Sequence, residues 1–530
     1  MASSSTSSES AAVHQPSPNS RHRPWIVIGF LLISLLYFAD TLLRTTLKTF
    51  WYDELCTVYL CRLPTFHATW RAVLIGGADL NPPLFYLVTR WAQHFSGEGL
   101  IATRLPAIIG FWIFGVCLYF FAARRLGRIC GCIAALTPWF TFAGYYAYEA
   151  RPHGAVLAWC GLMLVCWQRS RASARVRQWP PDLWIVGLFF SFLAALLTHV
   201  YAVFLAIPFM LVEANDLLRR RRIHVATCAA ILLPLCLVAR IYLRMRAHYS
   251  AGISGGGLPA HTYEVVQHFL TTIFGPGLVL LIIVLALLAW RSHQSSASDT
   301  PAASFTREEL IVGIGLLLLP VFGVIVAKIT HGPYFDRYFL AATAGYAIFL
   351  AQVVAAYGSR RFVARVLLTV MLLFFVADML IAADCHWHHR SLDQAGPGNL
   401  VVFSPDPARP FLRNISLLQD RSQLDILVVG HPDYLFFQYY ASPDLRRRLI
   451  YAAPDSKEMF LVGYRTISHW TGAGLRTTSF DDYFAHHRDF LLYEANRDDC
   501  PTCVETILKH GFLLRSVQRD VDGKLEHFSK

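Results

Sequence analysis

The chain has 530 residues, of which 55% are hydrophobic and only 15% are charged, and its formal net charge is +12. A soluble protein of this length carries roughly a quarter charged residues, so the composition excludes an ordinary soluble enzyme and indicates a polytopic membrane protein. The basic residues cluster in short loops between apolar segments, as membrane topology requires, so the positive charge does not indicate nucleic-acid binding. Most of the 12 cysteines lie inside apolar segments as small hydrophobic residues and predict no disulfide framework.

Residues 1–23 are rich in serine and proline and lack apolar periodicity, so they predict a disordered cytoplasmic N-terminus. The apolar run that begins at Trp25 is not followed by a small-residue cleavage site, which favours an uncleaved first span over a signal peptide. Because a span needs about 20 residues, we predict about eleven transmembrane helices, at 25–43, 102–123, 130–149, 152–168, 182–199, 200–217, 224–243, 268–290, 310–328, 338–357 and 363–383.

Residues 84–95 are apolar but too short to cross a bilayer. Their apolar side chains share one helical face, which predicts a helix lying in the membrane interface. Asn81 can cap this helix and Pro82 suits its first turn. With the N-terminus inside and this helix not crossing, every arginine-rich loop falls on the cytoplasmic side, as the positive-inside rule requires.

We place the membrane domain at 24–384. In this topology nearly all of its unusual polar residues lie on the outer side of the membrane. These residues lie in the first outer loop (44–101) and in the segments 149–153, 198–199, 246–267 and 331–338. After Ala383 the pattern changes to short strands at 401–403, 426–429 and 490–493, with helical stretches at 434–440 and 504–510. Residues 385–530 therefore predict a soluble extracytoplasmic α/β domain.

Asp53 and Glu54 follow the first span, where packing against lipid does not need carboxylates. Moving a sugar from a lipid phosphate to a hydroxyl needs a carboxylate that takes the hydroxyl proton as the new bond forms. Adjacent helical residues diverge by about 100°, so we assign Asp53 as this base and Glu54 as a neighbour that binds the acceptor or orients the loop. The structural alternative is that Asp53 caps a helix beginning at Glu54.

Further candidates lie in the other outer segments. Arg151 and Arg337 lie at span boundaries, and we expect one of them to hold a lipid phosphate or diphosphate through its planar guanidinium, although such an arginine can also simply reach for water. His199 lies near the outer end of a span, where a structural histidine is the alternative. Asp79 precedes a helix start that favours anions. The alternative is that its carboxylate only assists in capping that helix. The candidate substrate-binding set is Asp79, Asn81, Arg151, His199, Arg337 and Tyr338.

No metal site is predicted. The run from Cys385 to His389 holds metal-ligating residue types, but no second ligand group with fitting spacing lies nearby. Cys500 and Cys503 form a CxxC pair outside any thioredoxin-like unit. On an oxidising face they could form a local disulfide, or one of them could pair with Cys385. The sequon at Asn414 has meaning only in a eukaryotic lumen.

A family resemblance rests on the order and common outer placement of four short motifs. These are Asp53-Glu54 after the first span, Asp79-Leu80-Asn81-Pro82-Pro83-Leu84, Glu149-Ala150-Arg151-Pro152 and Asp336-Arg337-Tyr338. Together they resemble the bacterial glycosyltransferase family 39 proteins of the GT-C superfamily, whose relatives include protein O-mannosyltransferases and the aminoarabinose transferase of lipid A. The resemblance covers residues 25 to 383, the membrane-domain part of the chain.

This resemblance implies a multi-span enzyme that takes a sugar from a polyprenyl phosphate carrier, normally with inversion. Its catalytic aspartate would be Asp53. In the aminoarabinose branch a lysine precedes the Pro-Pro pair and contacts the lipid phosphate, whereas this chain has Asn81 there. The phosphate contact is therefore expected from another residue.

The sequence thus predicts an inner-membrane glycosyltransferase, transferring a hexose or pentose from a polyprenyl-phosphate donor to a glycan, lipid or protein hydroxyl on the outer face. No cofactor is required and a divalent metal is compatible with the site; membrane lipids, and no nucleic acid, are the expected partners. A polytopic lipid or polysaccharide transporter or flippase is the alternative, which would favour charged or broken segments near the bilayer midplane and paired halves. A structural assembly protein is a third class, and it would keep its cellular role when Asp53 is substituted.

Overall fold

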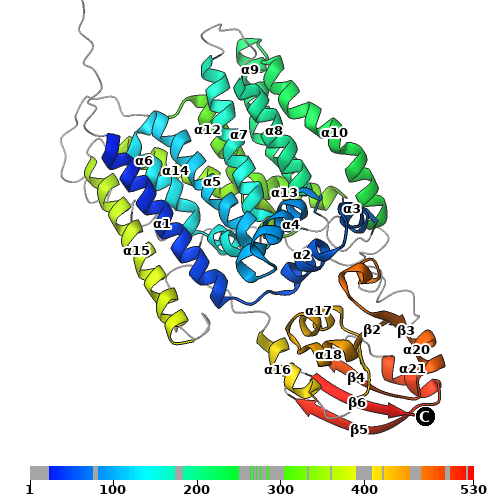
Figure 1. The fold of residues 1–530 in the computed structure, drawn as a ribbon. Coiled ribbons are helices and arrows are strands. Elements are labelled where there is room, and N and C mark those ends of the chain that lie inside the picture. Colours follow the sequence, from blue (N-terminus) through cyan, green and yellow to red (C-terminus); the bar gives the residue numbers. More distant parts are fainter. Residues whose placement is uncertain are drawn as a thin grey trace, which may run out of the picture.

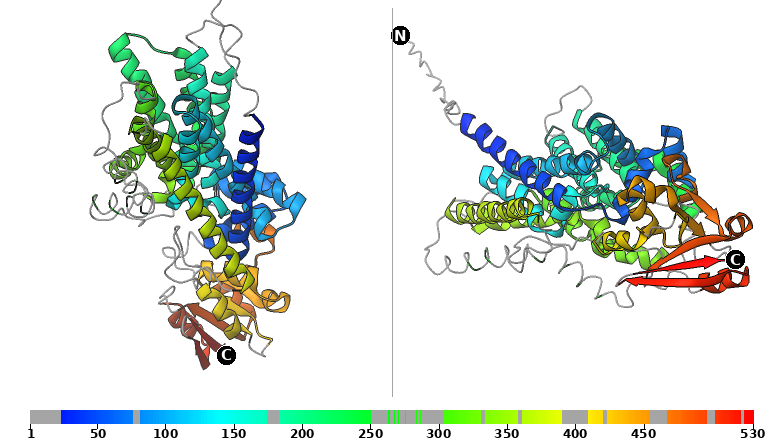
Figure 2. Two further views of the ribbon diagram at one scale, coloured as in Figure 1. Left: turned by 90° about the vertical axis from the view of Figure 1, so that its left-hand side faces the viewer. Right: turned by 60° about the horizontal axis from the view of Figure 1, so that its bottom comes forward.

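The structure is a computed structural model of the whole chain in which a long helical bundle is followed by a small sheet domain (Figure 1). It describes residues 23–75, 81–173, 183–249, 304–330, 334–357, 361–389, 409–419, 423–453, 467–495, 502–520 and 523–530, together with single residues between 263 and 286. Two further views show the sheet domain attached at one end of the bundle (Figure 2).

The helices of the bundle overlap the predicted spans, apart from the second half of 130–149 and from 268–290, which lies largely outside the described residues. They are α1 (Arg23–Leu47), α5 (Leu100–Leu126), α6 (Arg128–Leu136), α7 (His153–Ser173), α8 (Leu183–Thr198), α9 (Ala206–Arg220), α10 (Val225–Tyr249), α12 (Arg307–Leu317), α13 (Leu319–Thr330), α14 (Ala342–Tyr357) and α15 (Arg361–Trp387). By length and composition, five helices of the described chain could each cross a membrane, and α12 with α13, bent by 50°, would make a sixth. The predicted polytopic helical fold is confirmed.

The continuous helix predicted for 130–149 is wrong in its second half. Helix α6 ends at Leu136 and two 3₁₀ helices follow, η2 (Thr137–Phe140) and η3 (Phe142–Tyr148). Pro138 lies in the first turn of η2 and cannot donate a backbone hydrogen bond, while the Thr141 hydroxyl accepts the Ala143 N–H and starts η3. These tight turns lead the chain to Glu149 at the end of the bundle.

Three short helices follow α1 and lie at the end of the bundle that faces the sheet domain: α2 (Tyr52–Arg62), α3 (Phe66–Ile75) and α4 (Leu84–Ser96). On α4, Trp91 and Phe95 are 66% and 68% exposed, while Thr89 and Gln93 are buried. Its apolar face thus points away from the protein, as an interfacial helix requires. The expected cap is wrong, because the residue preceding α4 is Pro83 and Asn81 lies outside the helix.

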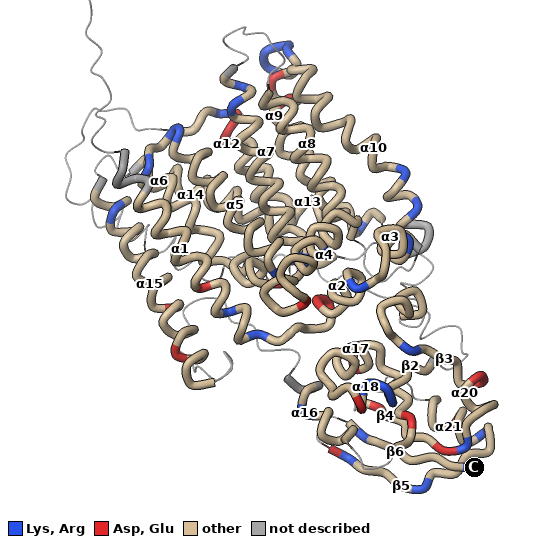
Figure 3. Tube along the Cα trace, viewed as in Figure 1, with Lys and Arg blue, Asp and Glu red and all other residues tan. Residues whose placement is uncertain are grey.

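Charged residues gather at the two ends of the bundle and leave its middle largely apolar (Figure 3). The end remote from the sheet domain carries the basic residues of the predicted cytoplasmic loops, and some of them pair across helices, as Arg171 does with Glu213 and Asp216. A buried ion cluster joins α1 to α15, in which Arg44 bonds to both Asp40 and Asp378.

The C-terminal domain is a six-stranded mixed sheet in the order β3-β2-β1-β4-β6-β5. Its strands are β1 (Ile426–Val428), β2 (Leu449–Ala453), β3 (Thr477–Ser479), β4 (Asp489–Ala495), β5 (Leu513–Asp520) and β6 (Gly523–Ser529). Strands β3, β2, β1 and β4 are parallel, whereas β6 is antiparallel to β4 and β5. The structure confirms the predicted strands at 426–429 and 490–493; the third, at 401–403, lies outside the described residues.

Alternate side chains of the central strands enter two separate cores, as strand geometry dictates. Ile426 and Val428 pack with α16 (Arg409–Leu418) and α17 (His431–Tyr440), whereas Leu427 packs with α20 (Phe480–His486) and α21 (Cys503–Lys509). The first core also contains residues of α2, so the domain packs directly on the helix that carries Asp53. Cys503 is disulfide-bonded, whereas Cys385 is buried and belongs to no disulfide, so the alternative pairing with Cys385 is wrong. The remaining short elements are α18 (Pro443–Arg448), η4 (Val200–Leu205), η5 (Asp336–Phe339) and η7 (Thr471–Ala473).

Candidate active site

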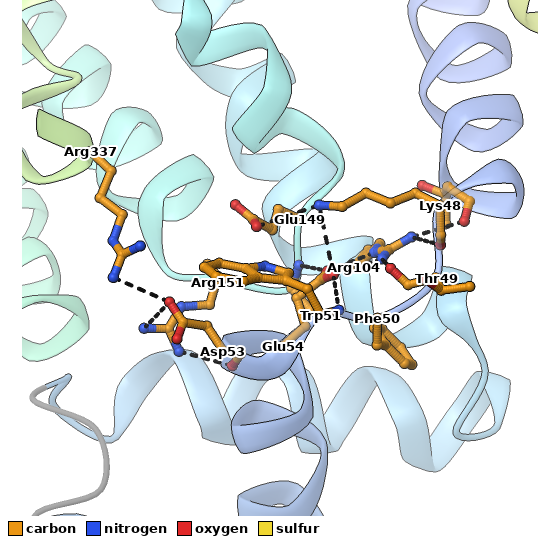
Figure 4. Close-up of polar contacts among 12 residues, drawn as sticks. Lys48, Thr49, Phe50, Trp51, Asp53, Glu54, Arg104, Glu149, Arg151 and Arg337 are labelled. Carbon is orange, nitrogen blue, oxygen red and sulfur yellow. Dashed lines mark hydrogen bonds and ion pairs between the residues drawn. The ribbon is translucent and has the colours of Figure 1, made fainter. Parts of the chain in front are cut away.

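Asp53 and Glu54 lie in the first turn of α2, which begins at Tyr52. The residue before the helix is Trp51, whose N–H donates to the Glu54 carboxylate at 3.3 Å. The structural alternative, Asp53 as the cap of a helix starting at Glu54, is therefore wrong. The two carboxylates point in different directions, and each has its own set of basic partners (Figure 4).

Asp53 lies between two arginines from separate parts of the chain. Its Oδ2 is 3.3 Å from an Nη2 of Arg337 and 3.9 Å from an Nη2 of Arg151, and its backbone carbonyl accepts a hydrogen bond from Arg151 at 3.1 Å. The Asp53 side chain keeps 16% of its surface exposed, and its Oδ2 accepts no hydrogen bond from the described residues. Two cations thus face one accessible carboxylate, an arrangement that suits an anionic ligand beside a base.

Aromatic rings fix the Arg337 guanidinium. Its central carbon lies 5.0 Å from the Phe335 ring, 5.7 Å from the Tyr338 ring and 5.8 Å from the Trp51 ring. Such contacts orient a cation without neutralising it. Phe335 and Tyr338 lie within η5 or directly before it, whereas Trp51 is the residue that precedes α2.

A small cavity of about 20 Å³, enough for roughly one water molecule, lies beside Arg337. His153, His199 and Tyr338 line it, and the two imidazole rings are 5.5 Å apart. The His199 Nδ1 accepts the Tyr201 N–H, so its Nε2 carries the proton. His153 is buried and its Nε2 has no hydrogen-bond partner among the described residues. The cavity therefore presents polar atoms next to Arg337, one of the two arginines that face Asp53.

Glu54 faces away from this cavity and is completely buried. Its two oxygens accept hydrogen bonds from Nε and Nη2 of Arg104, each at 2.7 Å. The other Arg104 donors bind backbone carbonyls of Thr45, Lys48 and Thr49 at 2.9–3.0 Å. All five N–H groups of this arginine are satisfied, so Arg104 fastens α5 to both the start of α2 and the linker before it.

A second set of contacts joins Glu54 to the segment that carries Arg151. The Ala150 N–H donates to Glu54 at 2.6 Å, and Lys48 lies 3.7 Å from Glu54 and 3.4 Å from Glu149. Burial opposes ionisation, yet the ion pairs with Arg104 and Lys48 lower the pKa of Glu54 below its ordinary value. Burial raises the pKa of Glu149, which Lys48 only partly offsets. Of the two roles considered for Glu54, this geometry fits the orientation of the loop.

The structure brings five of the predicted site residues together: Asp53, Arg151, His199, Arg337 and Tyr338. Asn81 is buried ahead of α4, and Asp79 lies outside the described residues, so their substrate-binding roles stay predictions. The sequence interpretation did not single out Lys48, Arg104 or His153. Arg104 did leave a signal, since a charge five residues into an apolar span calls for a buried partner.

Among the described residues, the Cys385–His389 run contributes to no cluster of metal-ligating side chains. Cys385 is buried against Ala382 and Leu47, and His388 pairs with Asp384 one helical turn away. Within the described part of the chain, no group of three or more metal-ligating side chains could hold an ion.

Comparison with solved structures identifies the fold. The chain is similar to ArnT from Cupriavidus metallidurans bound to undecaprenyl phosphate, with a TM-score of 0.56 and 12% identity over 95% of this chain and 98% of that one. The apo state of the same protein gives a TM-score of 0.57 and 12% identity over 96% and 98%. This is the GT-C fold.

The GT-C fold is recognised here from structure alone. No protein-family model and no curated protein sequence matches the chain. A weaker likeness links it to the Archaeoglobus fulgidus oligosaccharyltransferase tethered with an acceptor peptide, with a TM-score of 0.41 and 13% identity over 81% of this chain and 64% of that one. The structural match to ArnT covers both the bundle and the sheet domain, so the whole architecture is shared.

Proposed function

We propose that this protein is a membrane glycosyltransferase that moves a sugar from a polyprenyl-phosphate donor to an acceptor hydroxyl, with Asp53 as the base. The observation that carries the proposal is the accessible Asp53 carboxylate between Arg151 and Arg337, at 3.9 and 3.3 Å. The shared fold with an ArnT that binds undecaprenyl phosphate supports a lipid-phosphate donor.

In the proposed reaction the acceptor O–H gives its proton to Asp53 as its oxygen attacks the anomeric carbon. The bond between that carbon and the phosphate oxygen breaks, and the electron pair leaves with the lipid phosphate. Attack from the face opposite the leaving group inverts the anomeric centre. Arg151 and Arg337 stabilise the charge that develops on the phosphate, so the reaction requires no divalent metal and is compatible with one.

The proposed active face is the extracytoplasmic side of the inner membrane. Helix α2, which carries Asp53, lies at the end of the bundle opposite the arginine-rich loops, which the positive-inside rule assigns to the cytoplasm. The disulfide of Cys503 supports an oxidising surrounding for the C-terminal domain. We propose 24–384 as the catalytic domain and 385–530 as the extracytoplasmic domain.

The test compares purified wild-type protein with Asp53→Asn for release of sugar from defined polyprenyl-phosphate sugars. The substitution keeps size and hydrogen bonding but removes the base, and we expect turnover to fall at least about 100-fold with binding of polyprenyl phosphate retained. Equal turnover would move the chemistry away from Asp53. No turnover by wild-type protein with any carrier-linked sugar, together with intact lipid binding, would favour the flippase alternative.

A further inference from the structure

The linker between α1 and α2 is held from two opposite sides. Arg104 of α5 binds the linker carbonyls of Lys48 and Thr49, and it also binds the Thr45 carbonyl near the end of α1. From the other side, Tyr440 of the C-terminal domain reaches Phe50: its hydroxyl accepts the Phe50 N–H at 2.6 Å and lies 3.4 Å from the Phe50 carbonyl. The backbone three residues before Asp53 is therefore fixed by the last residue of α17.

The Phe50 side chain also lies between α5 and α17, where it contacts Arg104 and Tyr439. It is fully buried, with its ring 5.0 Å from the Arg104 guanidinium and 5.4 Å from the Tyr439 ring. Three further contacts lie along the same interface: the Tyr52 ring against His431 at 5.2 Å, the Tyr59 hydroxyl to the Leu435 carbonyl at 3.4 Å, and Arg62 over the Tyr439 ring at 5.3 Å. Helix α17 thus contacts the catalytic helix and its linker at several points.

We propose that the C-terminal domain is a working part of the active site and that Tyr440 is a positioning residue for Asp53. This inference rests on the proposed function of Asp53. A base must be held within a fraction of an ångström of its working position, and small displacements are costly to turnover. Within the membrane domain, Glu54 and Arg104 hold the first turn of α2. Helix α17 of the C-terminal domain holds the residues directly before this turn. The sheet domain therefore packs on the bundle and, by positioning Asp53, also increases the rate of catalysis.

A matched pair of substitutions on α17 separates positioning from stability. The Tyr434 hydroxyl also bridges the N–H and the carbonyl of a single residue, Arg476, at 2.8 and 2.9 Å, but within the C-terminal domain. Tyr440→Phe and Tyr434→Phe remove the same group from the same helix in the full-length protein. Both should lower the unfolding temperature, whereas only Tyr440→Phe should lower kcat, about three- to tenfold, with an unchanged KM for a polyprenyl-phosphate sugar.

Hydrogen exchange gives a second readout that does not depend on turnover. Tyr440→Phe should speed amide exchange in a peptide covering residues 48–54, and Tyr434→Phe should leave that peptide protected. If wild-type protein has no turnover, the proposed function fails while exchange still decides the positioning role. Equal effects of the two substitutions on kcat, or unchanged exchange at 48–54 in Tyr440→Phe, would overturn the inference.

Discussion

Removing the Arg104 guanidinium is the most direct test of how the first turn of α2, which carries Asp53 and Glu54, is held. Arg104→Met keeps an unbranched side chain of similar length and deletes all five donors. Glu54 would then remain as a fully buried carboxylate, with the Ala150 and Trp51 N–H groups and a lysine at 3.7 Å as its partners. Such a change leaves a buried charge without its main counter-ion.

The expected loss is about 3–5 kcal/mol of unfolding free energy, the usual cost of removing one partner from a buried ion pair. Thr45, Lys48 and Thr49 also lose hydrogen-bond donors, each worth about 0.5–1.5 kcal/mol, which places the loss at the upper end of this range. The double variant Arg104→Met with Glu54→Gln removes both charges. It should be more stable than the single variant, because no unpaired charge is left buried.

Thermal unfolding of the detergent-purified protein measures these differences, with Arg447→Met as the control. Arg447 pairs with Asp444 in a fully exposed geometry, with the two side chains 76% and 85% exposed, so its loss should cause no measurable change. The reasoning would be refuted if Arg104→Met unfolded at the same temperature as this control. A double variant less stable than the single one would show that the buried charge is not the cause.

Two further predictions concern the docking of the C-terminal domain and the packing of the bundle. Burial lowers the pKa of His431 from its ordinary 6.5 to about 4, so between these values the unfolded chain binds more protons. Stability should therefore be lost as pH falls through this window, by about 2 kcal/mol near pH 5; a pH series of unfolding temperatures that is equally steep in His431→Phe would contradict this. A Cβ at Gly154 would lie 2.6 Å from the Ala107 carbonyl oxygen, whereas one at Gly29 would meet nothing within 4 Å. Gly154→Ala should cost about 1–3 kcal/mol and Gly29→Ala should not, and equal unfolding temperatures would refute this account.

The spans and the candidate base could be predicted because their signals are local. A membrane helix must be apolar over about 20 residues, so α5 and α15 are visible in the sequence. Asp53 is visible because carboxylates directly after a span have no role in lipid packing. The end of α6 at Leu136 was harder to predict from the sequence, because an apolar composition does not distinguish an α-helix from the 3₁₀ turns that begin at Thr137.

The partners of the site could not be predicted because they are distant in sequence. Glu54 meets Arg104 and Ala150, which are 50 and 96 residues away, and no local pattern records these pairings. Strand β5 was missed for a different reason. Every residue of β5 is exposed, so the alternation of buried and exposed side chains that indicates a strand is absent there.

The polar atoms of the candidate site differ in whether they have a hydrogen-bond partner among the described residues. Arg104 has every donor paired and Glu54 both oxygens, as buried structural groups require. Asp53 Oδ2, Arg337 Nε and His153 Nε2 are buried atoms without a hydrogen-bond partner in the described part of the chain. Leaving such atoms unpaired costs stability, and all three belong to residues that meet around one cavity and one carboxylate. We propose that a polar substrate supplies these hydrogen bonds, with the donor phosphate at Arg337 and not at the equally charged but fully paired Arg104.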